Sequence, residues 1–356
     1  MRNSRTVIFQ AKNLPVLQNR LYTTEAEAVS CPTGDVLLKP DPRTSIISNE
    51  AFDSKRVVYD QHYNNEQGAS VAFKAHLEGI ADLIERHFGE PDLIEVGCGK
   101  GVFLDCLRRR GFELTGLDPA YEGDDPMILK QLFTEGLGLR ANGIILRHVL
   151  EHVQNPVSFL HAISAANDGK GLIYIEVPCF DWICKNRAWF DIFYEHVNYF
   201  RLEDFSRIFG RLLHAERTFG GQYLSIIGDL ETLSEAFVSC VQPPVPSDLM
   251  EGAGKVSETM REWKEHRSGL NVVWGAGSKG VIFNLHMSRR NAPVDYVVDI
   301  NPDKAGKFLP CTGIRVSSPE EFNREVRSGS RIFVMNPNYL EEVQALTGNR
   351  HEYLCA

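Results

Sequence analysis

The segment Glu95–Gly101, with the sequence EVGCGKG, has the clearest chemical meaning in the chain. It joins a short apolar run to a run with helical periodicity, which predicts a turn from a strand into a helix. Glycines at such a turn permit tight backbone conformations and let a ligand approach the main chain. The acid at the start favours a ligand with a cationic or amino group. The candidate contacts are Glu95, Gly97, Cys98, Gly99 and Gly101.

The spacing of these glycines argues against a dinucleotide. A dinucleotide fingerprint reads G-x-G-x-x-G, and Gly101 comes one residue too early for it. Asp118 ends the next apolar run, about 20 residues further on, where a carboxylate can accept both hydroxyls of a ribose. An amino acid and a ribose without phosphate describe S-adenosylmethionine, which we expect to bind here. A structural turn beside a surface acid, or a nicotinamide or flavin nucleotide, are the alternatives.

A second group of residues could move protons. Methylation of carbon needs a carbanion, and a base that removes the proton next to a ketone supplies one as an enolate. Histidine suits this role because it titrates near neutral pH. We expect His196, in the polar and aromatic segment 191–200, to be the base, with Glu195 orienting it or raising its basicity. A structural histidine bonded to a carbonyl oxygen is the alternative.

Other side chains could assist that reaction. His152 could stabilise the enolate oxygen or hold the substrate, and His148 lies one helical turn before it, so both can share a face. Tyr63 could close over the cofactor from the N-terminal region, and Tyr194 could contribute a hydroxyl group. Each of these four could also be an ordinary packing residue.

The elements that carry these residues alternate along the chain. Residues 71–89 have helical periodicity. We then expect strands at 92–96, 114–117, 128–133, 143–146 and 171–177, helices at 102–110, 157–166 and 201–209, and a terminal strand pair at 212–219 and 223–230. This α/β pattern predicts a doubly wound, Rossmann-like parallel sheet that binds its ligands at the carboxyl ends of the strands.

A second α/β unit follows a mostly helical stretch. It has expected strands at 271–274, 294–299 and 331–335, the glycine loop Gly275–Gly280 and a helix at 281–289. Asp299 ends its second strand, so a nucleotide could bind, although the loop lacks a convincing ribose acid; packing is the alternative. Lys279 and Lys304 could contact phosphate or simply be surface lysines.

Length and composition set limits on the whole protein. The 356 residues suit an N-terminal lobe at 1–70, a cofactor domain at 71–230, a helical linker at 231–268 with a proline loop at 243–246, and a smaller Rossmann-like domain at 269–356. The net charge of −9 argues against nucleic-acid and membrane partners. The first 15 residues lack the apolar core of a signal peptide, and no run could span a bilayer. We therefore expect a cytoplasmic protein whose eight cysteines are buried free thiols.

The motifs resemble those of class I S-adenosylmethionine-dependent methyltransferases. The resemblance rests on Glu95–Gly101, Gly116–Pro119 and Arg147–His152. It implies that the loop holds the methionine part and that Asp118 holds the ribose, with Pro119, Arg147 and His148 also at the cofactor. The family usually contacts adenine with an aspartate after the third strand. Gln131 stands at that place here, and its amide could hydrogen-bond the adenine amine.

A wider resemblance covers most of the chain. The order of its parts is similar to that of C-methyltransferases that act on nucleotide-linked keto-deoxysugars. The matching residues are Tyr63, Gly68, Ser70, His152, Glu195, His196, Gly220, Gly221, the segment 274–280, Asp299 and 302–304. Two departures stand out. That family binds zinc through four N-terminal cysteines, of which only Cys31 remains, near Gly34, so we expect no metal. It often has a tyrosine where this chain has Phe193.

These observations together predict a C-methyltransferase whose small-molecule substrate, a nucleotide-linked keto-sugar or similar keto-metabolite, lies between two Rossmann-like domains. Three other hypotheses remain open. The protein could methylate oxygen or nitrogen of a metabolite, it could be a non-catalytic subunit that binds S-adenosylmethionine, or it could use NAD at its second glycine loop. The sequence does not define the oligomeric state.

Overall fold

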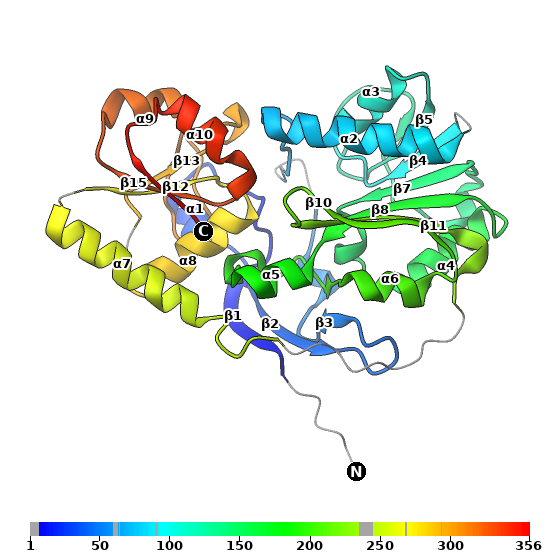
Figure 1. The fold of residues 1–356 in the computed structure, drawn as a ribbon, viewed down its shortest axis with the longest axis horizontal. Coiled ribbons are helices and arrows are strands. Elements are labelled where there is room, and N and C mark those ends of the chain that lie inside the picture. Colours follow the sequence, from blue (N-terminus) through cyan, green and yellow to red (C-terminus); the bar gives the residue numbers. More distant parts are fainter. Residues whose placement is uncertain are drawn as a thin grey trace, which may run out of the picture.

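The computed structural model describes residues 7–59, 63, 65–89, 92–234, 245–267, 269–292 and 294–356. Two α/β bodies lie side by side, and the N-terminal sheet runs beneath both of them (Figure 1). Residues 243–244 of the predicted proline loop at 243–246, and residues 235–242 of the predicted helical linker, fall outside the described residues. Within the described chain, no helix combines the length and apolar character that crossing a bilayer would require.

The larger body is built on a seven-stranded sheet with the order β10-β11-β8-β7-β4-β5-β6. Its strands are β4 (Asp92–Val96), β5 (Glu113–Leu117), β6 (Ile128–Leu129), β7 (Gly143–Arg147), β8 (Leu172–Pro178), β10 (Leu212–Thr218) and β11 (Tyr223–Asp229). All neighbours are parallel except at β11, which is antiparallel to β8 and β10. The predicted doubly wound sheet is confirmed, and the strand order reverses between β4 and β7, where such sheets bind their ligands.

Helices cover both faces of this sheet. They are α2 (Val71–Phe88), α3 (Val102–Arg108), α4 (Pro156–Ala166), α5 (Phe180–Asn186) and α6 (Leu202–Ile208). Figure 1 shows α2 and α3 on one face and α4 and α6 on the other. The helix α2 begins where predicted because the Ser70 hydroxyl accepts a hydrogen bond from the Phe73 amide at 3.2 Å. Two separate apolar cores result, one on each face of the sheet.

The smaller body has a five-stranded parallel sheet with the order β14-β13-β12-β15-β16. Its strands are β12 (Asn271–Trp274), β13 (Tyr296–Val298), β14 (Val316–Ser317), β15 (Arg331–Val334) and β16 (Glu352–Cys355). Its helices are α7 (Glu251–Arg267), α8 (Ser278–Ser288), α9 (Pro319–Glu325) and α10 (Leu340–Leu346). The helix α8 starts three residues before the predicted position, so the third glycine of the loop, Gly280, lies inside its first turn.

The N-terminal region is a four-stranded antiparallel sheet, formed by β1 (Phe9–Pro15), β2 (Thr33–Pro40), β3 (Ile47–Asn49) and β9 (Asn198–Tyr199), with one short helix, α1 (Glu25–Val29). Its fourth strand comes from the segment after β8, so the larger body completes the sheet. The buried side chains of β1 and β2 belong to one core with those of α5 and α8. The region therefore has no separate core among the described residues.

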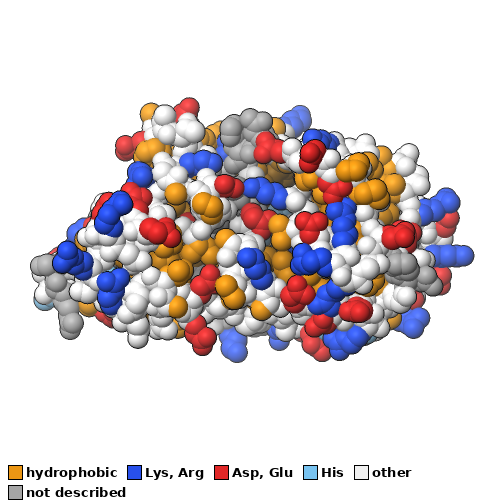
Figure 2. All heavy atoms as spheres, turned by 90° about the horizontal axis from the view of Figure 1, so that it is seen from above, with side chains coloured by type: hydrophobic (Ala, Val, Ile, Leu, Met, Phe, Trp, Pro, Cys, Tyr) orange, Lys and Arg blue, Asp and Glu red, His pale blue; other side chains and the backbone are white. Residues whose placement is uncertain are grey.

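Single turns of 3-10 helix connect several of these elements. They are η1 (Ser54–Arg56), η2 (Glu135–Leu137), η3 (Leu150–His152), η4 (Trp189–Asp191), η5 (Leu230–Thr232), η6 (Pro302–Lys304) and η7 (Pro337–Tyr339). Two of them lie at the site. The turn η3 contains Glu151 and His152, and η4 ends just before the segment that contains His196. On the face seen in Figure 2, basic and acidic side chains are interspersed.

Candidate active site

The loop after β4 adopts a conformation that depends on glycine. Gly97, Gly99 and Gly101 have φ angles of 73°, 56° and 80°, a region that side chains with a Cβ rarely adopt. The Gly97 amide donates to the carbonyl oxygen of Leu117 at 2.7 Å, which holds the loop on the neighbouring strand. A Cβ atom at Gly97 would lie 2.4 Å from Cγ2 of Val149. The loop is therefore folded close to the chain that follows β7.

A cavity of about 810 Å³ opens beside this loop, within the size range of small-molecule sites. Its lining contains the predicted cofactor residues Glu95, Gly97, Cys98, Gly99, Asp118, Pro119, Arg147 and His148. Asp118 accepts the Gly99 amide on Oδ2 at 2.9 Å and the Ala120 amide on Oδ1 at 2.8 Å. These two bonds fix the carboxylate at the carboxyl end of β5, where a ribose is expected.

Glu95 supplies the second polar anchor of the cavity. Its side chain is buried and its Oε2 atom has no hydrogen-bond partner in the described chain. Burial raises its pKa to about 7, with Arg147 acting in the opposite direction. A buried, unpartnered carboxyl group is costly unless a ligand satisfies it. An ammonium group would do so, and the donor set of Glu95 and Asp118 therefore fits the amino acid and ribose of S-adenosylmethionine.

Gln131 does not lie where the prediction placed it. It is exposed, and the cavity lining includes its neighbour Leu132 instead. The strand β6 has only two residues, Ile128–Leu129, against six in the predicted strand. The chain therefore leaves the sheet early and Gln131 is exposed, so the structure gives no support to its adenine assignment, which stays a prediction.

A buried charge network lies behind the cavity, around Glu176 of β8. Its carboxylate is 3.2 Å from both Arg147 Nη2 and His148 Nε2, and 2.8 Å from His76 Nε2. Burial opposes ionisation of Glu176, but Arg147 and the two histidines hold its pKa well below the usual value. Only one signal in the sequence pointed to this residue, a single acid within an otherwise apolar strand.

His148 is held as a cation by this network. Its Nδ1 atom is 3.3 Å from Glu151 Oε1. Burial acts to lower its pKa, but Glu151 and Glu176 raise it to about 9. The residue also has a φ of 53°, an uncommon conformation for a non-glycine residue that is found disproportionately at functional sites. A positive charge is thus fixed at the end of β7, in the wall of the cofactor cavity.

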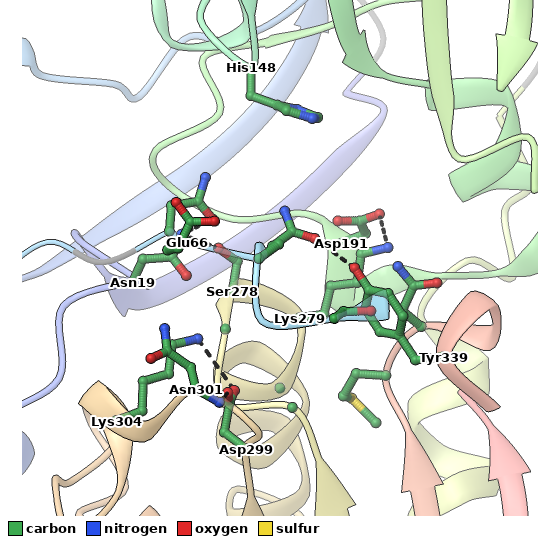
Figure 3. A pocket seen from close by; sticks show the side chains of 18 of the residues that line it. Asn19, Glu66, His148, Asp191, Ser278, Lys279, Asp299, Asn301, Lys304 and Tyr339 are labelled. Carbon is green, nitrogen blue, oxygen red and sulfur yellow. Dashed lines mark hydrogen bonds and ion pairs between the residues drawn. The ribbon is translucent and has the colours of Figure 1, made fainter. Parts of the chain in front are cut away.

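A second cavity, of about 180 Å³, lies between the two bodies. Figure 3 shows His148 on one side of it and Asp299, Asn301 and Lys304 on the other. Tyr63, His148 and His152 line both cavities. Together with Asn65, Glu66 and Gln67, which also line both cavities, these side chains form the boundary between the cofactor site and the space between the domains.

His196 and His152 meet at this boundary, with ring centroids 4.9 Å apart. His196 is 7% exposed, and its Nδ1 atom has no hydrogen-bond partner in the described chain. Burial, together with electrostatic interaction with His152, His148 and Lys279, lowers its pKa well below the usual value. His196 is therefore a neutral imidazole with a free nitrogen, which can accept a proton.

His152 is fixed by the main chain. Its Nδ1 atom lies 3.0 Å from the carbonyl oxygen of Glu195 and 3.2 Å from the Tyr59 hydroxyl. Burial lowers its pKa, against the opposing effect of Glu151. A hydrogen on Nδ1 that is donated to the carbonyl leaves Nε2 as the second functional atom. His152 can thus face a ligand in one defined orientation.

Glu195 lies in a different place from the one expected. Its carboxylate accepts the Gln18 amide at 2.5 Å, and its contacts with Tyr63 and the 18–19 main chain partly offset the burial that raises its pKa to about 7. It binds the N-terminal region, while Glu151 Oε1 is the carboxylate oxygen near His196, at 4.0 Å from Nε2. The sequence missed Glu151 because two acids adjoin the two histidines and only the fold shows which one turns inward.

Tyr194 is also displaced from the predicted site. Its side chain is buried against Gly34 and Phe52, and its hydroxyl accepts the Asp53 amide at 2.9 Å. The residue anchors the N-terminal region to the larger body. The structure therefore gives no support to a catalytic role for its hydroxyl, because residues 194 and 195 form a turn and the cavity lining includes Phe193 and His196 but not Tyr194.

The histidine cluster also has the atoms of a metal site. Glu151, His152 and His196 each offer one ligand atom, and these atoms lie within 4.8 Å of one another. Such a set suits a divalent transition metal. The cationic His148 beside Glu151 opposes a second positive charge at this point.

The glycine loop after β12 has the dinucleotide spacing, Gly275, Gly277 and Gly280. The acid that follows it, Asp299, is however already bound by other groups of the protein. Asp299 accepts the Ala276 amide at 2.7 Å and lies 3.3 Å from the buried Lys304 ammonium group, both on Oδ2. Lys279 is 3.1 Å from Asp191 and 2.7 Å from the amide oxygen of Gln222. The two predicted phosphate contacts are therefore paired within the protein.

Three features together are those of an S-adenosylmethionine-dependent methyltransferase. They are the central sheet, the glycine loop with its leading acid, and the carboxylate of Asp118 at the position expected to hold a ribose. The comparison with family models agrees. Residues 69–212 match a methyltransferase domain, and residues 254–351 match the C-methyltransferase C-terminal domain. The protein therefore belongs among the S-adenosylmethionine-dependent methyltransferases and carries the C-terminal domain of the C-methyltransferases.

Individual relatives cover different parts of the chain. It is similar to the C-methyltransferase NovU of Streptomyces niveus, with 22% identity, over 73% of this chain and 71% of the relative. A ubiquinone biosynthesis O-methyltransferase of Methylobacterium nodulans is 29% identical over 27% of this chain and 48% of its own length. The match thus spans about half of that second relative.

Solved structures show weaker likenesses. The 1,6-didemethyltoxoflavin-N1-methyltransferase of Burkholderia thailandensis has a TM-score of 0.33 and 14% identity, over 44% of this chain and 78% of its own. The magnesium protoporphyrin IX methyltransferase of Synechocystis PCC 6803 has a TM-score of 0.36 and 16% identity, over 49% and 91%.

Proposed function

We propose that this protein methylates a carbon atom next to the carbonyl group of a small molecule, and that a nucleotide-linked keto-sugar is the class of substrate. The single observation that carries the proposal is His196, a buried neutral imidazole with a free Nδ1 atom in the cavity between the two bodies. The similarity to NovU and the C-methyltransferase domain support the same reaction.

The donor is held from two sides in this proposal. Glu95 binds its ammonium group and Asp118 its ribose hydroxyls, while the glycine loop leaves room for its backbone. When bound, the cofactor supplies a methyl group on a positively charged sulfur, ready for attack by a nucleophile. Because Tyr63, His148 and His152 line both cavities, that methyl group would be presented across them.

The chain's own residues generate the nucleophile. His196 removes the proton next to the carbonyl group. Its lowered pKa keeps the imidazole unprotonated before the reaction, and it also makes the imidazole a weaker base than an exposed histidine. The enolate oxygen gains negative charge in this step, and a fixed positive charge stabilises it most effectively. His148 is that charge, since Glu151 and Glu176 keep it protonated. His152, neutral and with its hydrogen donated from Nδ1, presents Nε2 as an acceptor and holds a hydroxyl group of the substrate.

Transfer of a labelled methyl group tests the proposal. The protein is incubated with methyl-labelled S-adenosylmethionine and a panel of nucleotide-linked sugars with and without a ketone, and NMR locates the new methyl group. Label on the carbon next to a ketone, lost in His196→Ala and retained in Phe193→Tyr, supports the proposal. Label on oxygen or nitrogen, or equal turnover by His196→Ala, contradicts it.

A further inference from the structure

Two cysteines from distant parts of the chain meet where the N-terminal region contacts the smaller body. Cys31 follows α1, and Cys311 lies in the turn that precedes β14, 280 residues later. Their Sγ atoms are 3.5 Å apart. Cys31 is buried and Cys311 is partly exposed, so solvent reaches the pair from one side.

The backbone holds this pair in register. Tyr22 and Phe308 exchange two hydrogen bonds, of 3.0 Å and 2.9 Å, in an isolated antiparallel bridge. Further along, the Cys311 amide donates to the carbonyl oxygen of Ala28 at 2.8 Å. Cys311 itself has a φ of 64°, a conformation that a non-glycine residue keeps only when its surroundings enforce it. The two thiols are therefore neighbours because the main chain places them together.

The two sulfur atoms have unlike reactivity. The hydrogen bond from the Cys311 thiol lowers the pKa of Cys31 to about 7, although burial acts against it. The same pairing, with burial, raises the pKa of Cys311. Cys31 is thus about half thiolate at pH 7, and Cys311 remains a thiol. A nucleophilic cysteine beside a resolving cysteine is the arrangement that oxidants such as peroxides exploit.

We propose that Cys31 and Cys311 are a site of reversible oxidation that joins the N-terminal region to the smaller body by a disulfide. The Cys31 thiolate attacks one oxygen of hydrogen peroxide, breaks the O–O bond and becomes a sulfenic acid, and the released hydroxide takes up a proton to form water. The Cys311 sulfur then attacks the Cys31 sulfur, and the S–O bond breaks. The thiol proton of Cys311 leaves with the departing oxygen as a second water. The two sulfur atoms are oxidised by two electrons in total, and the peroxide is reduced.

The bond would act on the cavity between the two bodies. The segment that leads to Tyr22 contains Asn19, whose side-chain amide donates to Ser278 Oγ at 2.9 Å and to Asn65 Oδ1 at 3.1 Å. Asn19 and Ser278 both line the cavity of about 180 Å³, which is smaller than the roughly 300–1,000 Å³ of small-molecule sites. A large substrate would enter only if the two bodies separate, and the disulfide opposes that separation. This consequence rests on the proposed function, whereas formation of the bond does not.

Peptide mapping of the full-length protein tests the site itself. The protein is treated with hydrogen peroxide, free thiols are alkylated, and the digest is compared with that of a sample reduced by a phosphine. We expect a linked pair of peptides that contains Cys31 and Cys311, and a thermal midpoint several degrees higher that returns to its starting value on reduction. Cys311→Ser should lose both effects. Cys355→Ser, which removes an exposed thiol on β16, is the matched control and should keep both.

Other outcomes overturn the proposal. Equal alkylation of Cys31 and Cys311 before and after peroxide contradicts it, as does oxidation that falls mainly on Cys355. The comparison of alkylation before and after peroxide uses the wild-type protein, so its result stays decisive even if a serine variant fails to fold. Methyl transfer is then compared between the reduced and the linked protein. If the linkage forms and turnover falls several-fold, both statements stand. If the linkage forms and turnover is unchanged, the effect on the cavity is refuted while the oxidation site and the methyltransferase function remain.

Discussion

The two glycine loops of this chain have the same order of strand, loop and helix, but the acids that follow them have different neighbours. Each follows a parallel strand, precedes a helix and is followed by an acid at the end of the next strand, Asp118 or Asp299. In both, that acid accepts a loop amide on Oδ2, from Gly99 at 2.9 Å and from Ala276 at 2.7 Å. The Asp118 carboxylate borders a cavity of about 810 Å³. The Asp299 carboxylate is in addition paired with a buried lysine.

This difference shows that a glycine pattern alone does not define a ligand. The second loop has the dinucleotide spacing, yet its acid is already neutralised by Lys304. The first lacks that spacing, yet it is preceded by an acid, Glu95, with an unsatisfied oxygen atom. We infer that the first loop serves binding and the second chiefly serves packing, and each of the following predictions separates the two roles.

The largest contrast should come from removing the two acids. Asp118→Ala should weaken S-adenosylmethionine binding about 100-fold or more, because each hydrogen bond to a charged group contributes about 1.5–3 kcal/mol. The free energy of unfolding should change little. Asp299→Ala should leave binding intact but lower the free energy of unfolding by about 3–5 kcal/mol, since it leaves the Lys304 charge buried and unpaired. Calorimetric titration and urea unfolding of both variants provide the test. Reversed effects would exchange the roles of the two loops.

The glycines should show a smaller contrast of the same kind. A Cβ atom at Gly280 would lie 1.8 Å from the carbonyl oxygen of Gly275, so Gly280→Ala should destabilise the fold by about 1–3 kcal/mol or more through overpacking. A Cβ atom at Gly99 meets open space, but the φ of 56° costs about 1–2 kcal/mol. Gly99→Ala should therefore destabilise the fold less than Gly280→Ala, and it should in addition weaken cofactor binding because Gly99 lines the cofactor cavity. Thermal unfolding with and without S-adenosylmethionine distinguishes them, and equal ligand-induced shifts in the two variants would count against the assignment.

Cofactor affinity should depend on pH through Glu95. Burial raises its pKa to about 7, so the group is mostly protonated at pH 6 and mostly ionised at pH 8. An ammonium group binds the ionised form better, and the affinity for S-adenosylmethionine should rise several-fold across this interval. Glu95→Gln should bind weakly at every pH and lose the dependence. Titrations at several pH values measure both, and an unaltered pH profile in Glu95→Gln would assign the effect to another group.

The smallest expected signal concerns NAD. Because Lys304 and the Ala276 amide already occupy Asp299, the second loop should give no measurable heat with NAD under conditions where S-adenosylmethionine binds. Calorimetry with the two ligands in turn compares them directly. Saturable NAD binding that disappears in Asp299→Ala, but persists in Asp118→Ala, would show that the second loop is a nucleotide site after all.

Local patterns in the sequence were sufficient for most of the fold. The strand before each glycine loop was predicted at its observed bounds, Asp92–Val96 and Asn271–Trp274, because a short apolar run that ends in glycine has few other solutions. Asp118 followed from the spacing of the same unit. The prediction failed at β6, where pairing of only two residues with β5 leaves too little periodicity to detect, and Gln131 was misplaced as a result.

The site depended on contacts that no local pattern contains. Glu195 and Glu151 each precede a histidine, but only packing against Gln18 shows that Glu195 turns towards the N-terminal region. Glu176 reaches His148 and His76 from a different strand, which gives His148 its positive charge. The interdomain cavity and the Cys31–Cys311 pair likewise come from segments far apart in the sequence. Such contacts are consequences of the tertiary fold, so single-sequence reasoning could name the residue types and not their partners.

The central claim is that His196 generates a carbanion next to a carbonyl group, and proton exchange measures this step without the methyl transfer. The protein, saturated with S-adenosylhomocysteine, is incubated in deuterated water with a keto-sugar nucleotide that accepts label in the transfer assay, and NMR follows the proton next to the ketone. We predict that the wild-type protein exchanges this proton and that His196→Ala slows the exchange at least 100-fold, consistent with the 10²–10⁴-fold contribution of a general base. Equal exchange by the two proteins, or methyl transfer by His196→Ala at the wild-type rate, would contradict the account.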